Sequence, residues 1–548
     1  MGPDCRKRKT PNKKLSDVSP GSRNCSIMKR DDMLKLVRER RAPWDMIIVG
    51  GGATGAGVAV DAATRGYATL LLEQHDFGKG TSSRSTKLVH GGVRYLEQGN
   101  VSLVMEALKE RGLLRQNAPH IVSELGCIVP SYAWWEGPFY GIGLKLYELL
   151  AGKYGFGKSH TISKEETLAR LPNVNPEGLT GGIVYYDGQF DDTRLLINLV
   201  ATAADQSATL LNYAKVNRLN KGSDGIVNGL TWQNVETGET FDAQAKVVVN
   251  ATGIFTDSVR RLADPEVNPL IAPSQGAHLV FDHSFLPGAN AILVPHTRDG
   301  RVMFAIPWHG HTLVGTTDTP VKDSPLEPVA LDDEIDFILE TAGQYLEKKP
   351  ARSDILTVFA GIRPLAKSGD AGNTAALSRD HTIHIDKSGL LSITGGKWTT
   401  YRNMAQGCVD QAATLADLPD KPCVTHNLNI HGYHLNAANF GSLSYYGSDA
   451  PAIRRLIDEN KSLGGLLDPQ LSYVEAEVVW AARMEMARTV EDVLARRTRA
   501  LFLNARAAIR MAPKVASILA RELGKDEVWK FDQVKAFLQV AKGYTAAV

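Results

Sequence analysis

The chain has 548 residues, more than one ordinary hydrophobic core supports, so we expect two or three domains. A hydrophobic share of 43% with 22% charged residues is typical of globular proteins and excludes a wholly disordered chain. The net charge of +2 hides an uneven distribution, since residues 1–44 carry a net charge of +8 and the remainder about −6. Because the excess of basic residues is confined to one segment, the composition does not indicate nucleic-acid binding.

Residues 1–43 are predicted to form a basic, disordered N-terminal extension. The run Arg6–Lys9 lacks the apolar stretch that a secretory signal needs, and acidic residues such as Asp17 are unusual in a mitochondrial presequence. Met28 is an alternative start of the native protein, a hypothesis that mass spectrometry of the N-terminus tests.

Cysteine usage and hydropathy exclude several classes of protein. The five cysteines are scattered and form no C-x-x-C pair, which argues against a disulfide framework or a zinc site and is typical of a reducing compartment. The chain has no D-x-D-x-D-G calcium loop, so we expect no bound metal. It has no run of 18 apolar residues, so we expect no transmembrane helix.

A glycine-rich loop begins the α/β region. Met46–Val49 reads as a buried strand that leads into Gly50–Gly55, which fits G-x-G-x-x-G, and then into a helix over Ala56–Arg65. Glycines there allow a tight turn, a close approach of the backbone to a pyrophosphate and close packing of helix on strand. The helix N-terminus offers N–H groups to phosphates, and Glu73, at the end of the next strand, can accept hydrogen bonds from a ribose. The sequence therefore predicts dinucleotide binding.

Three further segments favour FAD over NAD. Thr81–Lys87 supplies hydroxyl groups suited to a pyrophosphate and a ribityl chain, and Val247–Gly253 is a strand that ends in small residues. Leu390–Thr394 runs into the glycine turn and helix start Gly395–Thr400, where a helix N-terminus would stabilise the negative charge of a reduced flavin. The order of these segments along one chain indicates an FAD enzyme.

Strand-like and helical patterns predict an α/β fold in several parts. Strand-like runs recur at Thr69–Leu72, Lys246–Val249, Val302–Ile306 and Thr312–Val314. We predict an oxidoreductase region over 44–425, in which FAD-binding segments near 44–125, 180–265 and 355–415 alternate with segments of an antiparallel substrate-binding sheet. Good helix formers dominate the end of the chain and predict an α-helical domain over 426–548. We expect the arginines around Arg496, Arg497, Arg499, Arg506 and Arg510 to form a solvated, ion-paired surface.

Together the motifs resemble those of the FAD-dependent, aerobic, quinone-linked glycerol-3-phosphate dehydrogenases over about residues 44–525. The resemblance rests on Gly50–Gly55, Thr81–Lys87, His90–Glu97, Gly315–Asp318, Gly361–Leu365 and Gly395–Arg402. It implies a Rossmann-like FAD-binding domain of the glycine-oxidase and D-amino-acid-oxidase class, with an antiparallel-sheet substrate domain and a helical C-terminal domain. It also implies non-covalent FAD and oxidation of sn-glycerol 3-phosphate to dihydroxyacetone phosphate, by hydride transfer from C2 to flavin N5.

The resemblance further implies a cationic pocket for the substrate phosphate. Arg363 and Arg379 are the expected phosphate clamp, and Arg94, Tyr95 and Lys397 complete the pocket. Arginine suits this role because its planar fork binds phosphate oxygens bidentately. Without the resemblance, each of these arginines would be interpreted as a surface or ion-pair residue.

His278 is the candidate general base, because a histidine pKa of about 6.5 suits proton removal close to neutrality. The alternative is a core or flavin-contacting histidine, since that pKa is common to all histidines. We expect Arg94, Arg363 and Lys397 to act with His278 in catalysis. His90 is expected to pack on the flavin without a covalent link.

The expected FAD contacts lie in the same motifs. They are Gly50, Gly52, Ala53, Thr54, Gly55, Glu73, Thr81, Ser82, Ser83, Lys87, Leu88, His90, Gly91, Val216, Thr252, Gly253, Asp318, Gly361, Gly396, Lys397 and Thr399.

An aromatic stretch that begins at Trp134 raises the question of a membrane contact. An amphipathic helix over about Phe139–Ala151 could lie in the interfacial plane, with Lys145 and Lys153 reaching the headgroups. A buried helix under the flavin domain is the alternative. The resemblance favours the membrane surface, because members of that family are monotopic and reduce ubiquinone or menaquinone. It implies a peripheral protein on the cytoplasmic, inner face of a bacterial plasma membrane or, alternatively, on the mitochondrial inner membrane, and leaves a homodimer open.

Rival functions share the same fold. A glycerol-3-phosphate oxidase would give its electrons to oxygen, and an amine oxidoreductase would clamp an amino-acid carboxylate. A non-enzymatic flavin-binding scaffold need not retain Arg94, Arg363, Arg379 and Lys397 together, so we favour an enzyme. The resemblance implies a role in glycerol and glycerophospholipid catabolism that feeds a respiratory chain.

Overall fold

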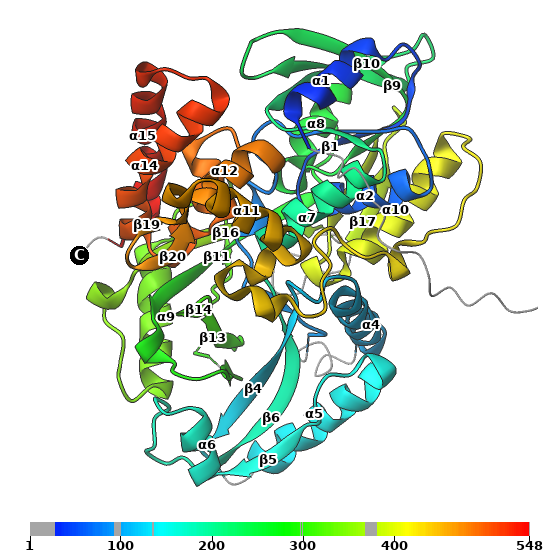
Figure 1. The fold of residues 1–548 in the computed structure, drawn as a ribbon. Helices are drawn as coiled ribbons and strands as arrows, with labels where there is room; N and C mark the ends of the chain where they lie inside the picture. The colour runs from blue at the N-terminus through cyan, green and yellow to red at the C-terminus, as the bar shows by residue number, and fades with distance from the viewer. Residues whose placement is uncertain are drawn as a thin grey trace, which may run out of the picture.

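Two large β-sheets and a group of C-terminal helices organise the chain in the computed structural model (Figure 1). The structure describes residues 28–92, 100–133, 136–295, 297–298, 300–367 and 381–546, with the side chains of 137–139 excepted.

The first sheet carries the glycine loop. Its strand order is β17-β18-β10-β1-β2-β7, with bounds His381–Ile385, Leu391–Gly395, Thr240–Asn250, Trp44–Val49, Thr69–Leu72 and Thr209–Leu211. The strands from β18 to β7 run parallel, and β17 is an antiparallel edge. Strand β10 also pairs with β9 (Val227–Asn234), which pairs with β8 (Ala214–Lys221). The strands predicted in this part of the sequence overlap β1, β2, β10 and β18, but β10 begins at Thr240, six residues before the predicted run.

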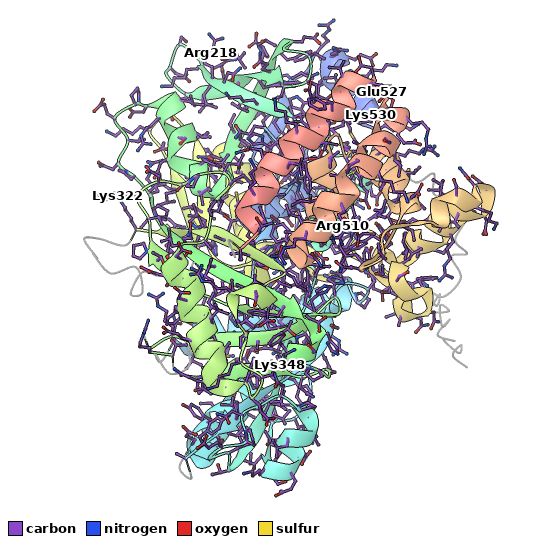
Figure 2. The ribbon with its side chains drawn as sticks, turned by 90° about the vertical axis from the view of Figure 1, so that its left-hand side faces the viewer. Arg218, Lys322, Lys348, Arg510, Glu527 and Lys530 are labelled. Atoms are coloured by element: carbon purple, nitrogen blue, oxygen red, sulfur yellow. The ribbon has the colours of Figure 1, made fainter. Side chains whose placement is uncertain are left out.

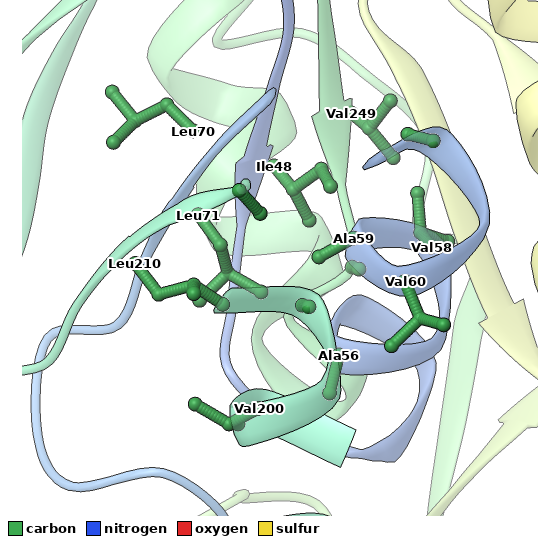
Figure 3. Close-up of a cluster of buried hydrophobic side chains, with 14 of the residues drawn as sticks. Ile48, Ala56, Val58, Ala59, Val60, Leu70, Leu71, Val200, Leu210 and Val249 are labelled. Carbon is green, nitrogen blue, oxygen red and sulfur yellow. The ribbon is translucent and has the colours of Figure 1, made fainter. Parts of the chain in front are cut away.

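The core of the first sheet forms where helices α2 (Ala53–Thr64) and α7 (Asp192–Asp205) meet the central strands (Figure 3). Ile48, Leu71 and Val249 come from three neighbouring strands and are fully buried, as are Ala59 on α2 and Val200 on α7. Parallel strands covered on both faces need such continuous apolar runs. Helix α10 (Tyr401–Leu415) packs against α2, and α8 (Thr256–Ala263) follows β10.

The second sheet is the predicted antiparallel one. Its order is β15-β11-β14-β13-β12-β4-β6-β3, with bounds Thr319–Pro320, Ile271–Asp282, His311–Gly315, Met303–Trp308, Ala291–Val294, Ser123–Ser131, Gly181–Gln189 and Leu88–Val89. Strand β16 (Thr357–Ala366) pairs with β11, and β5 (His160–Ser163) with β6; only the β12–β4 pair of the described residues in this sheet is parallel. Its helices are α4 (Val101–Asn117), α5 (Glu136–Ala151), α6 (Lys164–Arg170) and α9 (Asp332–Tyr345).

Helix α1 (Arg30–Glu39) corrects part of the prediction of a disordered extension. Leu34 and Val37 are buried, and the helix packs against β7. The Arg30 guanidinium donates to the Asn234 side chain at 2.9 Å and forms an ion pair with Glu236 at 3.2 Å. The prediction of disorder is wrong for these ten residues, because their apolar side chains share one helical face that the first sheet covers. Residues 1–27 lie outside the described residues.

Beyond residue 426 the chain is mostly helical, as predicted. The helices are α11 (Ala450–Glu459), α12 (Glu475–Met484), α13 (Ala500–Leu503), α14 (Ala505–Leu523) and α15 (Glu527–Ala541). A short hairpin of β19 (Leu466–Asp468) and β20 (Leu471–Val474) was not predicted. Figure 2 shows Arg510, Glu527 and Lys530 on the exposed side of α14 and α15. The predicted domain boundaries stay a prediction.

Three C-terminal arginines are buried, which corrects the prediction of a solvated surface. Arg496 and Arg497 both contact the Asp76 carboxylate, and Arg499 donates to Asp192 at 3.1 Å. None of the three is more than 2% exposed. Local helical spacing could not reveal a carboxylate 420 positions earlier in the chain. The prediction is right for Arg510, which pairs with Asp468 at the surface.

None of the helices in the described ranges combines the length and apolarity that crossing a bilayer requires.

Candidate active site

A cavity of about 960 Å³ lies at the carboxyl ends of the central strands of the first sheet. Val49 and Leu72, at the ends of β1 and β2, line it, and the second sheet contributes His278 and Arg363. Small-molecule sites span roughly 300–1,000 Å³, and this cavity is at the upper end of that range. It therefore has room for a dinucleotide together with a small substrate.

The glycine loop forms one wall of the cavity. Gly50 has φ of 107°, and a β-carbon there would lie 2.7 Å from the Ala251 carbonyl oxygen. A β-carbon on Gly55 would overlap the carbonyl oxygen of Gly50. Helix α2 can therefore pack this closely against the turn only because residue 55 is glycine. Helix α2 begins at Ala53, three residues earlier than predicted, and Ala53 and Thr54 lie on the cavity wall. The first N–H groups of a helix suit a phosphate at this position.

Glu73 follows the end of β2 and lines the cavity, as predicted. Its carboxylate accepts hydrogen bonds from the N–H groups of Gly51 at 2.7 Å and His75 at 2.9 Å, which fix its orientation. Burial raises the pKa of Glu73, and the two backbone donors limit that shift. A carboxylate held beside the glycine loop fits the ribose hydroxyls of a dinucleotide.

The segments that we predicted to bind FAD converge around this wall. Ser82 Oγ accepts a hydrogen bond from the Ala53 N–H at 2.9 Å, and the Ser82 carbonyl accepts one from the Trp398 indole at 2.9 Å. The His90 N–H donates to the Thr399 hydroxyl at 3.1 Å. The same cavity is lined by Gly52, Thr81, Leu88, Val216, Thr252, Gly253, Gly361 and Gly396. Since the glycine positions leave space and the polar groups face it, the residues present fit a bound FAD.

His278 lies on β11 in the cavity wall and is 2% exposed. Its Nε2 is 2.9 Å from the Thr86 hydroxyl, and its ring stacks on Phe359 with centroids 4.8 Å apart. Burial lowers the pKa of His278 well below its usual value, and the charges of Lys87 and Arg363 lower it further. A lowered pKa makes this imidazole a weaker base than an exposed histidine, so the pKa argument made from the sequence does not support the base role. Its role as the base stays a prediction.

Arg363 reaches the cavity from β16, and four groups of the described residues contact its guanidinium. It donates to the Thr316 hydroxyl at 3.1 Å and to the carbonyl oxygens of Thr317 at 3.0 Å and Gln275 at 3.3 Å. The Asp318 carboxylate lies 3.4 Å from the guanidinium. These contacts engage both Nη atoms and pair the guanidinium with Asp318, and they hold it in a fixed orientation on the cavity wall.

Two further arginines line the cavity and were not assigned from the sequence. Arg301 donates to the Asp318 carbonyl oxygen at 2.5 Å, and Arg84 donates to the Gly80 carbonyl oxygen at 2.8 Å. The predicted Lys397 lines the same cavity. Arg84 lies inside the Thr81–Lys87 motif, which was the available signal, whereas Arg301 precedes β13 in a segment without a motif.

Some predicted residues are not among those that line the cavity. Arg94, Tyr95 and Arg379 lie outside the described residues. Gly55, Ser83 and Gly91 lie behind the wall rather than on it. The Gly91 N–H, for example, donates to the Tyr147 hydroxyl at 2.7 Å.

Lys87 is a clear correction to the predicted FAD contacts. Its ammonium is fully buried, 2.6 Å from the Asp192 carboxylate and 2.9 Å from the Ser83 carbonyl oxygen. It also lies over the Phe359 and Phe502 rings, 5.2 Å and 5.5 Å from their centroids. Burial lowers the pKa of Lys87, and Asp192 limits the shift. Lys87 therefore stabilises the fold of the 81–87 segment through Asp192 and the Ser83 carbonyl oxygen. Its side chain does not line the cavity.

Helix α5 contributes apolar side chains to the lining of the same cavity. Leu144 is buried, whereas Ile142 is 75% and Leu149 76% exposed, so the helix has one covered face and one exposed apolar face. Ile142 and Leu146 also line the cavity, together with Phe304. The predicted amphipathic helix thus exists, and it lies at the lower edge of the molecule in Figure 1. A wholly buried helix does not account for the exposed face, and a wholly interfacial helix does not account for the covered face.

Two family models and several individual relatives match this chain. The model described as FAD dependent oxidoreductase matches residues 45–402, and that of the C-terminal domain of alpha-glycerophosphate oxidase matches residues 391–530. A probable mitochondrial glycerol-3-phosphate dehydrogenase of Caenorhabditis elegans is 40% identical, with 91% of this chain and 73% of the relative covered. The mitochondrial glycerol-3-phosphate dehydrogenase of Arabidopsis thaliana is 40% identical, with 92% and 86% covered.

Solved structures agree with these relatives. The glycerol-3-phosphate dehydrogenase of Bacillus halodurans, complexed with FAD, has a TM-score of 0.77 at 29% identity and covers 94% of this chain and 97% of its own. A glycine oxidase from Geobacillus kaustophilus has a TM-score of 0.52 at 20% identity, with 71% and 99% covered, and it confirms the predicted fold class. The chain therefore belongs to the family of FAD-dependent glycerol-3-phosphate dehydrogenases, with FAD as its cofactor.

Proposed function

We propose that this protein oxidises sn-glycerol 3-phosphate to dihydroxyacetone phosphate and passes the electrons to a membrane quinone. The observation that carries the proposal is the oriented guanidinium of Arg363 in the same cavity as the glycine loop and His278. A fixed cation suits a phosphorylated alcohol, and the names of the relatives support that substrate.

Each group of residues has a separate task in the proposed reaction. The glycine loop, Glu73 and Ser82 hold the dinucleotide, and Arg363 and Lys397 bind the substrate phosphate. FAD bound in the cavity would accept the hydride from C2 of the substrate. His278 takes the proton of the C2 hydroxyl as the carbonyl forms. The Thr86 hydroxyl, 2.9 Å from Nε2, orients the imidazole for this step.

Anaerobic titration of the purified yellow protein tests this function. Addition of glycerol 3-phosphate is expected to bleach the flavin absorbance, and subsequent addition of a soluble ubiquinone is expected to restore it. Failure to bleach would overturn the proposed substrate. Recovery with oxygen and release of peroxide, but not with quinone, would favour an oxidase. Bleaching by amino acids but not by glycerol 3-phosphate would favour an amine oxidoreductase.

The exposed apolar face of α5 supports the membrane part of the proposal. Ile142, Leu146 and Leu149 follow helical spacing on this face, and Lys145 is exposed beside them. Met105 on the neighbouring α4 is 50% exposed. An apolar helix face with flanking lysines fits the interfacial region of a bilayer. Because Ile142 and Leu146 of this face also line the cavity, a quinone dissolved in the lipid could reach it directly.

Leu149→Glu is expected to weaken binding to phosphatidylcholine vesicles about tenfold or more, because burying a leucine side chain contributes roughly 1.5–3 kcal/mol. Leu149 is not among the residues that line the cavity, so the bound FAD should be retained. Vesicle co-sedimentation measures the first effect and flavin absorbance the second. Leu435→Glu is the matched control, since Leu435 is 73% exposed elsewhere. Equal sedimentation of the two variants would remove α5 from the membrane contact.

The names of the relatives bear on which membrane the protein would contact. The relatives from Caenorhabditis elegans, Arabidopsis thaliana and Rattus norvegicus are named as mitochondrial proteins. These names favour the mitochondrial inner membrane over the bacterial plasma membrane that we considered first. In either location the reaction would link glycerol and glycerophospholipid breakdown to a respiratory chain.

A further inference from the structure

Residues 321–331, which we call the strap, connect β15 to α9 without helix or strand. Leu326, near its middle, lines the FAD cavity. Lys322, near its beginning, lies at the edge of the molecule in Figure 2. The strap therefore extends from the solvent-exposed surface to the cofactor cavity.

Both ends of the strap are fixed by one buried carboxylate, that of Glu334. It accepts hydrogen bonds from the Thr317 hydroxyl at 2.8 Å and the Thr319 hydroxyl at 2.7 Å, just before the strap. It also accepts one from the Leu331 N–H at 3.0 Å, at the end of the strap. Glu334 is 4% exposed, so these bonds are shielded from water and hold the base of the strap closed.

The tip of the strap is held by Glu327. Its carboxylate lies 2.7 Å from the Arg84 guanidinium and 3.4 Å from the Lys79 ammonium, and it accepts a hydrogen bond from the Tyr544 hydroxyl at 3.3 Å. The Glu327 side chain is 28% exposed, unlike that of Glu334. Among the described residues, Glu327 supplies the hydrogen bonds and ion pairs of the 322–328 stretch. The base is thus fixed by buried bonds, and the tip is held through one partly exposed carboxylate whose partners Arg84 and Tyr544 are buried.

The partners of Glu327 belong to the cofactor site. Lys79 and Arg84 line the cavity on either side of the first FAD-binding hydroxyls, Thr81 and Ser82. Arg84 also donates to the Gly80 carbonyl oxygen at 2.8 Å, so it braces this segment from within. Opening the tip would release the strap from the segment that contacts FAD, while the base stayed in place.

We propose that the strap is the gate through which FAD enters and leaves, and that Glu327 is the positioning residue that holds it shut against Lys79, Arg84 and Tyr544. The proposal requires FAD in this cavity, but it does not depend on the substrate or on the electron acceptor. Tyr544 contributes from the other end of the chain, with its ring packed edge-on against Phe502 at 5.3 Å.

Release of FAD from Glu327→Gln tests the gate. After dilution of the holoenzyme, the rise in free-flavin fluorescence is expected to be about tenfold faster than in the wild type, which corresponds to a loss of about 1.4 kcal/mol. Glu340→Gln is the matched control, since Glu340 lies on α9 and pairs with exposed Arg298 at 3.1 Å.

Equal release rates from Glu327→Gln and Glu340→Gln would overturn the proposal. If Glu327→Gln does not fold, Tyr544→Phe decides the question, because it removes one hydroxyl and keeps the ring against Phe502. Its expected effect is a release about threefold faster, and an unchanged rate would likewise overturn the gate. Since glycerol 3-phosphate is absent from these experiments, their outcome is separate from that of the proposed reaction.

Discussion

Arg363→Ala is expected to raise the KM for glycerol 3-phosphate by about two orders of magnitude, because a charge-assisted hydrogen bond contributes about 2–3 kcal/mol. The guanidinium is already oriented by Gln275, Thr316 and Thr317, so the wild type loses little entropy when an anion binds. FAD should remain bound, since Arg363 is one of many residues around the cavity. Steady-state kinetics with a dye acceptor and the flavin absorbance of the purified variant measure the two effects.

The control variants distinguish a role of Arg363 in phosphate binding from a role in stabilising the Thr316–Asp318 turn. Arg363→Lys keeps the charge but loses the planar fork, and an intermediate KM is expected. Arg298→Ala, at an exposed arginine paired with Glu340, should leave KM unchanged. An unchanged KM in Arg363→Ala would remove this residue from the phosphate clamp. Loss of FAD together with a lower melting temperature would assign it to the Thr316–Asp318 turn instead.

Gly55→Ala is expected to yield a protein that does not retain FAD. Its β-carbon would overlap the carbonyl oxygen of Gly50, so either α2 or the turn before it must move. Overpacking of this kind costs typically about 1–3 kcal/mol, and here the displaced atoms belong to the wall that holds the cofactor. The flavin-to-protein absorbance ratio after gel filtration measures the loss.

Gly407→Ala is the matched control for Gly55→Ala. Gly407 lies in α10, and a β-carbon there would make an ordinary contact at 3.7 Å with Ile383 Cδ1. This variant should keep FAD and gain about 0.4–1 kcal/mol of stability, because alanine reduces the entropy of the unfolded chain. Full flavin content in Gly55→Ala would show that the turn tolerates the β-carbon and that close packing there is not required.

The cofactor wall could be predicted because its requirements are local. A parallel strand, a turn of defined glycines and a helix N-terminus must follow one another within a few residues. The spacing of Gly50–Gly55 and Glu73 in the sequence is therefore enough to predict their arrangement in space. The strand runs at 46–49 and 69–72 were predictable for a related reason, since a strand covered on both faces needs a continuous apolar run.

Other parts of the site could not be predicted from local patterns. Lys87 was predicted to contact FAD because it lies in a flavin motif, yet the Asp192 carboxylate that pairs with it is 105 positions away. Arg301 lines the cavity without any motif around it. Helix α1 was predicted to be disordered because its basic composition outweighed the apolar face formed by Leu34 and Val37. For Lys87 and helix α1 the decisive partner is distant in the sequence.

The buried pairing of Asp76 with Arg496 and Arg497 has a consequence for how the protein is made. Asp76 emerges from the ribosome early, and its counter-charges are translated 420 positions later. The Ser83 carbonyl oxygen likewise accepts a hydrogen bond from Arg499, which is translated 416 positions later. Until the last tenth of the chain is synthesised, the stretch between Glu73 and Thr81 carries a carboxylate that water must keep solvated. Cofactor loading should therefore follow the completion of translation rather than accompany it.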